Sequence, residues 1–405
     1  MKEIEFSVLA LSAALESGHI TAVELTEECF RRIDRERCGD SFAFLDRNGA
    51  MEAARAADRR RAEGKALGAL DGVPFAAEDR FCVKGMPTEN HCRMLRGYRP
   101  LYDAEAVERL RGQGAILLGK LQTDGFLSGR LEKQSRLASA AVANRVIPFA
   151  LTVETGGSCL LQGDGRALAF ASGRNGVARQ GVISCAPSFD RVGFLANTPT
   201  DAALLWSVLQ DRRTENSDQS QSVFHRVALF GENFFDEERI SRLQKDGAEL
   251  LLTKGAPLER VDLAFRILAA TEAASEMALY DGIRFGASVS GAKTAGEQAA
   301  ESRSAFFSEE EKRLILLGTA LLMGEHRQNC YQSARRLRDR IRREVGDWFG
   351  ACDLMICPLS GETVRLAGLA ELAAVAQGNA LLVAPKGREA LLLQWAERLC
   401  RAQEV

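Results

Sequence analysis

The sequence predicts an α/β protein with a large central mixed sheet that helices cover on both faces. The main observation is a repeated order of elements: residues 104–114 form an amphipathic helical pattern that ends in glycine, directly before the apolar run 115–119. The same order returns at 139–153 and at 236–252. The chain has 405 residues, 46% of them hydrophobic, so it can bury a core of the size that such a sheet needs. We expect a single domain over residues 1–405.

Local signals place several elements along the chain. Thr21 with Glu24 and Ser308 with Glu311 have the spacing of capping boxes, each ahead of a helical run. Residues 42–45 and 72–77 are short apolar runs that predict strands, and 50–64 predicts a helix that ends at Gly64. The polar segments 211–222 and 288–304 predict surface loops, the second of them mobile.

Composition excludes several classes of protein. The formal net charge is −2, so nothing in the overall balance requires a nucleic-acid or membrane partner. The ten cysteines are scattered without a CxxC pair, which indicates reduced thiols and a cytoplasmic location. No run approaches eighteen apolar residues. Only four histidines occur, and the adjacent His91 and Cys92 lack the further ligands of a metal site. We expect no metal and no cofactor.

A second helical run, 330–349, carries six arginines on its polar surface, at positions 335, 336, 338, 340, 342 and 343. We interpret this run as a solvated helix face, because charged runs on helices usually are. Contact with phosphate is the alternative.

The stretch ETGGSCL, residues 154–160, is a candidate nucleophile turn. Two glycines precede Ser158, and glycine allows positive φ and close backbone approach, so main-chain N–H groups can converge there as an oxyanion hole. A tight loop with no chemistry explains the same residues, because glycine and serine are common in turns.

Five segments, in order, resemble the amidase signature family, and within it the A subunits of bacterial aminoacyl-tRNA amidotransferases. They are ALDGVPFAAEDRFCVKGMPTENHCRML, YDAEAVERLRGQGAILLGKLQTDGF, AAVANRVIPFALTVETGGS, SFDRVGFLANTPTDAALL and EAASEMALYDGIRFG, of which the last favours the A subunits. The resemblance spans most of the chain and implies the amidase signature fold. It also implies partner subunits, one wrapped around the A subunit and one that binds tRNA, with no direct nucleic-acid contact by this chain.

The resemblance implies a serine nucleophile that a lysine activates through a bridging serine. Alignment of ETGGS with the family's DTGGS assigns Ser158 as the nucleophile and Thr155, Gly156 and Gly157 to the oxyanion hole. Asp281 and Arg284, in YDGIRFG, match positions that shape the substrate pocket; a charged turn after a helix explains them equally.

The proton relay departs from the family pattern. The family's GIPIAIKDN is here GVPFAAEDR, so Glu78 replaces the lysine and Asp79 is kept as a structural residue. The family's GSSGGSAAAV aligns with KQSRLASAAV, which puts Gln134 at the bridging position, Ser135 next to it, and Arg136 and Leu137 in place of two glycines.

The chain is also shortened around the site. The connection ahead of the bridging loop is largely absent, and the region after residue 357 is compressed. Glu371, in that region, aligns loosely with an aspartate that binds the glutamine amine in the family.

Two functions remain open. The first is a degenerate amidase with lost or strongly altered hydrolysis and a binding or scaffolding role. In the second, Ser158 still cleaves amides with a rewired base, for which Glu78 is a candidate if burial raises its pKa. More often an acid at such a position pairs with a cation, and Lys133 and Arg136 are the candidates.

Overall fold

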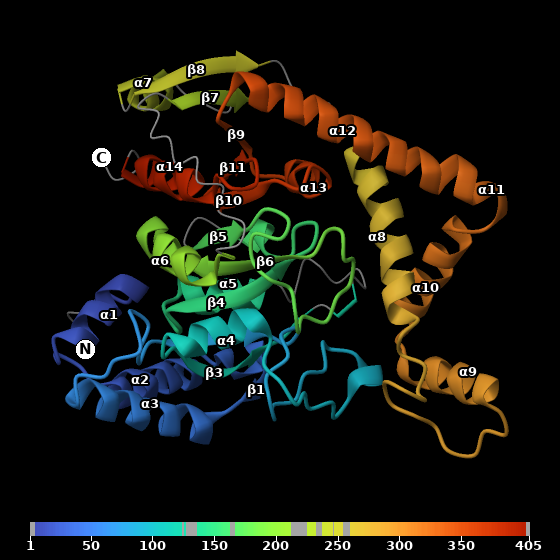
Figure 1. Cartoon of the computed structure of the whole chain (residues 1–405), viewed down its shortest axis with the longest axis horizontal. Coiled ribbons are helices and arrows are strands. Elements are labelled where there is room, and N and C mark those ends of the chain that lie inside the picture. Colours follow the sequence, from blue (N-terminus) through green and yellow to red (C-terminus); the bar gives the residue numbers. More distant parts are fainter. Residues whose placement is uncertain are drawn as a thin grey trace.

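One eleven-stranded sheet runs through the molecule in the order β1-β3-β2-β4-β6-β5-β10-β11-β9-β7-β8 (Figure 1). The structure is a computed structural model that describes residues 5–123, 125–126, 136–162, 167–211, 225–231, 237–245, 247–253 and 260–401. The strands are β1 (Phe42–Leu45), β2 (Pro74–Glu78), β3 (Ile116–Leu121), β4 (Phe149–Glu154), β5 (Leu168–Ala171), β6 (Arg191–Ala196), β7 (His225–Phe230), β8 (Ala248–Thr253), β9 (Leu354–Pro358), β10 (Ala373–Gln377) and β11 (Ala380–Ala384).

The sheet is mixed, as the sequence predicts. Strand β2 runs parallel to β3 and β4, and β7 runs parallel to β8 and β9. The middle strands β4, β6, β5, β10 and β11 form antiparallel pairs. Every residue of β2, β3, β4, β5 and β6 is buried, which explains why these strands are almost continuously apolar in the sequence.

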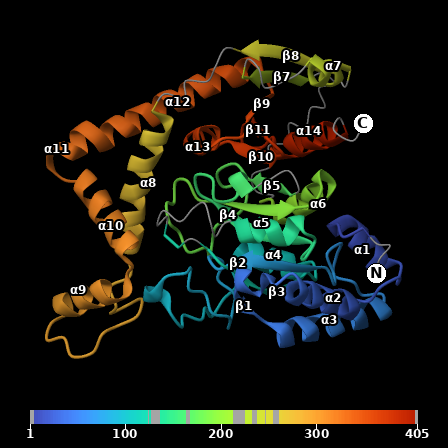
Figure 2. The same ribbon diagram turned by 180° about the vertical axis from the view of Figure 1, so that it is seen from behind.

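Helices cover both faces of the sheet, which confirms the predicted fold class. They are α1 (Val8–Glu16), α2 (Ala22–Arg35), α3 (Arg47–Ala62), α4 (Glu105–Gly112), α5 (Arg136–Ala143), α6 (Pro199–Leu209), α7 (Glu237–Lys245), α8 (Val261–Met277), α9 (Ala295–Phe306), α10 (Glu309–Leu321), α11 (Gly324–His326), α12 (Gln332–Ala351), α13 (Gly361–Leu369) and α14 (Glu389–Arg401). Helix α6 packs against α14, and α8 packs against α10, α12 and α13. Both views place α8 to α12 together at one side of the molecule (Figures 1 and 2).

Most predicted elements are confirmed, one is wrong, and the predicted loop 211–222 lies, apart from residue 211, outside the described residues. Both capping boxes form: Thr21 and Ser308 accept the N–H groups of Glu24 and Glu311, whose side chains bind back to the capping residues. The expected mobile loop 288–304 instead contains most of α9. Thr294 caps this helix by accepting the N–H of Glu297, a start signal that outweighs the polar composition.

Candidate active site

The glycine turn after β4 has the backbone that its sequence requires. Gly156 and Gly157 have φ of +68° and +122°, a region in which residues with a Cβ are strained. A Cβ on Gly156 would lie 2.1 Å from Cζ of Phe265, so this ring also needs glycine at that position. The turn therefore holds Ser158 just beyond a buried strand, and its role as a nucleophile stays a prediction.

The Ser158 hydroxyl is bound within its own turn. Its Oγ donates to the carbonyl of Val153 at 2.7 Å and accepts the N–H of Thr155 at 2.8 Å. With these two bonds to main-chain groups, the hydroxyl uses its proton and one of its two oxygen lone pairs. In this arrangement the hydroxyl proton points to a carbonyl and not to a base.

Glu78 lies beside this turn. It ends β2, next to β4, and its side chain is buried at 7% exposure. Oε2 accepts the N–H of Val153 at 2.9 Å. Glu78 and Ser158 thus bind the N–H and the carbonyl of the same residue, and the structure brings together the two positions that the sequence singles out as nucleophile and altered base.

A carboxylate occupies the inside of the turn. Glu154 is fully buried and accepts the N–H groups of Gly157 at 2.5 Å, Cys159 at 2.9 Å and Leu160 at 2.9 Å. Converging N–H groups form an anion site, and here an anion of the chain itself fills it. The N–H groups of Thr155 and Gly157 are thus both engaged internally, and their assignment to an oxyanion hole stays a prediction.

A buried ion pair contacts the side chain of Thr155 and so supports the turn. The Arg80 guanidinium pairs with Asp190 at 2.9 Å and donates to the Thr155 hydroxyl at 3.0 Å and the Ile183 carbonyl at 3.0 Å. Asp190 also accepts the Thr155 hydroxyl and, at 2.7 Å, that of Ser184. Burial alone would raise the pKa of Asp190, but the Arg80 charge and these hydrogen bonds outweigh it and lower the pKa.

Asp79 is structural, as the sequence suggests, and its partner is a buried lysine. Lys120 on β3 is fully buried, and its Nζ lies 3.0 Å from the Asp79 carboxylate and 3.0 Å from the Thr88 hydroxyl. Asp79 also accepts the N–H groups of Glu89 and Asn90. Burial raises the pKa of Asp79 and lowers that of Lys120. The pair fixes the segment after β2 against β3.

The remaining predicted site residues are not gathered at the turn. Gln134 and Ser135 lie outside the described residues, as do the side chains of Lys133 and Arg136. Asp281 accepts the N–H groups of Ile283 and Arg284, both at 2.9 Å, and pairs with the Arg284 guanidinium at 3.1 Å. The half-buried Asp281 and the exposed Arg284 form a local turn, and substrate binding by them stays a prediction.

Residues next to that turn line a cavity of about 480 Å³, among them Tyr280 and Phe285. Tyr98, Tyr102 and Ser184 contribute to the same wall. Ser184 donates to Asp190, so the cavity lies next to the buried Arg80–Asp190 pair that contacts the candidate nucleophile turn.

Glu371 is part of an ion cluster, and its alignment with a substrate-binding aspartate stays a prediction. Its Oε1 binds three arginines, Arg174, Arg338 and Arg342, from β5's following loop and from α12. Within the described part of the chain, no group of three or more His, Cys, Asp or Glu side chains is arranged to hold a metal. Nor does that part contain a helix long and apolar enough to cross a membrane. All ten cysteines are free thiols.

Four residues of the site were missed by sequence reasoning: Arg80, Lys120, Glu154 and Asp190. Lys120 gave a signal, because it is a lone charge in the apolar strand AILLGKL. Arg80 and Asp190 are 110 positions apart, so their pairing had no local signal. Glu154 was read only as a variant of the family aspartate, and its bonds to three N–H groups follow from the turn geometry.

Comparison with known proteins identifies the family. A family model described as Amidase matches residues 24–137 and 232–381. Similar relatives are the glutamyl-tRNA(Gln) amidotransferase subunits A of Chloroflexus aurantiacus, 34% identical over 87% of this chain and 82% of the relative, and of Streptomyces coelicolor, 30% identical over 90% and 83%.

Solved structures agree on the fold. The peptide amidase of Stenotrophomonas maltophilia superposes with a TM-score of 0.77 at 20% identity, over 98% of this chain and 97% of that one. A bacterial aryl acylamidase gives a TM-score of 0.78 at 18% identity, over 98% and 96%. The chain therefore belongs to the amidase signature family.

Proposed function

We propose that this protein is a degenerate member of its family, with lost or strongly altered amide hydrolysis and a binding or scaffolding role. The observation that carries the proposal is the state of the base position: a buried carboxylate, Glu78, stands there and accepts the main-chain N–H of Val153. This carboxylate is bound to the main chain of the turn, and position 134, where the family has its bridging serine, is glutamine in this chain.

The hydroxyl geometry supports the same function. A serine attacks an amide only when a positioned base takes its proton, because its ordinary pKa leaves it weakly nucleophilic. Ser158 donates its proton to the carbonyl of Val153, which cannot act as a base. Glu154 in addition accepts the hydrogen bonds of the N–H groups on the inside of the turn, including that of Gly157, so these groups are no longer available to a substrate. A developing oxyanion would meet a negative charge there.

The relatives suggest what such a protein binds. They are named as subunits A of a glutamyl-tRNA(Gln) amidotransferase, so we propose that this chain also works beside amidotransferase-type partner subunits. Contact with tRNA would then be made by a partner, since the net charge of −2 gives this chain no general attraction for nucleic acid.

A second candidate function is an active amidohydrolase or glutamine amidotransferase subunit. The contact of Glu78 and Ser158 with the same residue, Val153, favours it. For this function the Ser158 hydroxyl would have to leave the Val153 carbonyl and bind the Glu78 carboxylate. Glu78 would then take the proton directly, without a bridging residue.

Ammonia release distinguishes the two functions. We would measure release from glutamine, asparagine and simple amides with the wild type, Ser158→Ala and Glu78→Gln at matched purity. The control is Ser172→Ala, which removes a buried hydroxyl on the segment after β5 that donates to the Val192 carbonyl at 3.0 Å and not to the turn itself. The degenerate function predicts equal background release from all four proteins. Release that Ser158→Ala abolishes and Ser172→Ala preserves would overturn it and establish the second function.

A further inference from the structure

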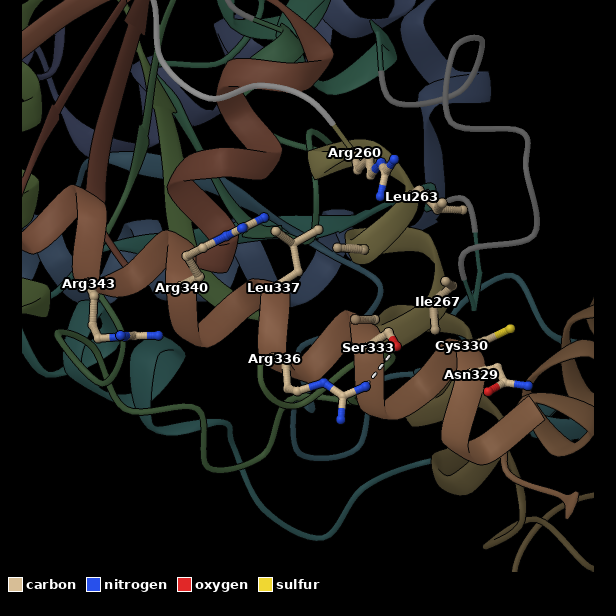
Figure 3. A pocket seen from close by; sticks show the side chains of 12 residues that line it. Arg260, Leu263, Ile267, Asn329, Cys330, Ser333, Arg336, Leu337, Arg340 and Arg343 are labelled. Atoms are coloured by element: carbon tan, nitrogen blue, oxygen red, sulfur yellow. Dashed lines mark hydrogen bonds between the residues drawn. The ribbon is translucent and has the colours of Figure 1, made fainter. Parts of the chain in front are cut away.

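Helices α8 and α12 enclose a cavity of about 510 Å³ on the side of the molecule where these helices cross (Figure 3). Its floor is apolar: Leu263, Ala264 and Ile267 come from α8, and Ala334 and Leu337 from α12. Figure 3 shows Leu263 and Ile267 on α8 and Leu337 on α12, the two helices that border the cavity. The volume lies in the range of small-molecule sites.

The polar part of this cavity is strongly basic. Arg260 precedes α8, and Arg336, Arg340 and Arg343 follow one another at intervals of four and three residues along α12. Residues at such intervals share one helix face. Among the described residues that line the cavity, none is acidic.

Among the residues that the structure describes, the ion pairs of α12 do not cancel this charge. Arg336 donates to the Ser333 hydroxyl at 3.0 Å, and Arg343 donates to the main-chain carbonyl of Asp339 at 3.4 Å, both neutral acceptors. Arg340 has a carboxylate nearby, that of Glu344 at 3.8 Å, a separation too long for a direct hydrogen bond.

The other arginines of α12 are used differently. Arg338 and Arg342 bind the carboxylate of Glu371, and Arg335 lies over the Tyr331 ring. The arginine run of this helix is thus divided between a structural ion cluster on one side and a cavity wall on another. Arg336, Arg340 and Arg343 are exposed, as a solvated face requires, and they also border an apolar depression.

We propose that this cavity binds a small organic anion, with its apolar body on the floor between α8 and α12 and its phosphate-type head group on the arginines. Planar guanidinium groups bind such oxyanions through paired N–H donors. An apolar floor that is partly open, with Leu263 57% exposed, gains from being covered by the body of the ligand. The site is separate from the Ser158 turn and does not depend on amide hydrolysis.

Binding is tested first with phenyl phosphate and octyl phosphate, by calorimetric titration of the full chain. These two probes share the head group and differ in an aromatic or aliphatic body, and benzyl alcohol serves as the neutral probe. The variant Arg336→Ala/Arg340→Ala removes half of the basic wall, and Arg335→Ala is its control on the same helix. We expect saturable binding of at least one phosphate with a Kd of about 1 mM or tighter, and no measurable binding of benzyl alcohol.

We expect the double variant to weaken phosphate binding by about tenfold or more, because it removes charge-assisted hydrogen bonds, and Arg335→Ala to leave it unchanged. The comparison of the two phosphates then identifies the body that fits the floor. Absence of saturable binding by both phosphates, or equal binding by the double variant and the wild type, would overturn the proposal.

Cys330 gives a second measurement, because it lines the cavity and is partly exposed. Its alkylation by N-ethylmaleimide, followed by mass spectrometry of its peptide, should slow when the bound phosphate probe is present. Cys38, which is partly exposed and lies elsewhere in the chain, is the internal control and should react at an unchanged rate. Equal effects on both thiols, or protection of neither at a saturating concentration, would contradict a ligand in the cavity.

Discussion

The contact of Gly156 with Phe265 can be isolated by substitution. In Gly156→Ala the new Cβ would lie 2.1 Å from Cζ and 2.6 Å from Cε1 of Phe265, closer than atoms of folded proteins approach. A side chain at φ of +68° costs roughly 1–2 kcal/mol in conformational energy, and overpacking costs roughly 1–3 kcal/mol more. We therefore expect Gly156→Ala to lower the free energy of unfolding by about 2–5 kcal/mol.

The two contributions separate because the chain offers a matched control. Gly64 has a φ of +69°, almost that of Gly156, but a Cβ there would meet nothing within 4 Å. Gly64→Ala therefore measures the conformational part alone, including any gain from a stiffer unfolded chain. The excess cost of Gly156→Ala over Gly64→Ala is the contribution of the Phe265 contact.

A double substitution completes the test. Phe265→Ala alone should cost about 3–5 kcal/mol, because the ring is buried at 5% exposure. In that background Gly156→Ala should cost no more than Gly64→Ala does in the wild type. The assay is equilibrium urea unfolding followed by tryptophan fluorescence and circular dichroism. If Gly156→Ala costs the same with and without the Phe265 ring, the ring does not support the nucleophile turn and the reasoning is refuted.

Three further predictions concern buried charges and use the same assay. Lys120→Met should cost about 3–5 kcal/mol, since it leaves Asp79 buried without its cation; Asp79→Asn added to it should restore part of the loss. Glu154→Gln should cost about 2–4 kcal/mol, because an amide has one accepting oxygen for three N–H groups; an unchanged midpoint would contradict this. Burial raises the pKa of Glu389 above its ordinary 4.5, so the folded state holds that proton more tightly. The stability of the wild type relative to Glu389→Gln should therefore fall as pH rises through and above 4.5.

The fold was largely predictable because its signals are local. Apolar strands that follow glycine-terminated helices, and capping boxes such as Thr21 with Glu24, depend on residues only a few positions apart. The positive φ of Gly156 and Gly157 was likewise foreseeable from two adjacent glycines. Helix α9 was missed because its composition, rich in small and polar residues, was weighed above the cap at Thr294.

The partners of the site residues were not predictable in the same way. Phe265 contacts Gly156, and Asp190 pairs with Arg80, although the two members of each pair are more than a hundred residues apart in the sequence. The packing of α8 and of the start of β6 against the turn sets these contacts. The surroundings of Glu371 were likewise not predictable: it pairs with Arg174 from the loop after β5 and with Arg338 and Arg342 from α12. Contacts between residues that are far apart in the sequence decide these roles, and a single sequence does not show which residues meet.

The stability effect of Ser158→Ala has a sign that separates a structural serine from a catalytic one. The Ser158 hydroxyl joins the Val153 carbonyl to the Thr155 N–H, at 2.7 and 2.8 Å. Its removal leaves two main-chain groups without that partner, at a cost of about 1–3 kcal/mol. Residues selected for catalysis are instead often neutral or stabilising to remove, because active sites trade stability for function.

We therefore expect Ser158→Ala to lower the urea midpoint with an unchanged slope, together with unchanged ammonia release. Ser158→Thr keeps the hydroxyl and should retain most of the stability if its methyl group is accommodated beside the half-buried turn. A midpoint for Ser158→Ala at or above that of the wild type would show that the two hydrogen bonds do not hold the turn. The retained glycine–glycine–serine sequence would then need another explanation, and a preserved nucleophile would become the stronger one.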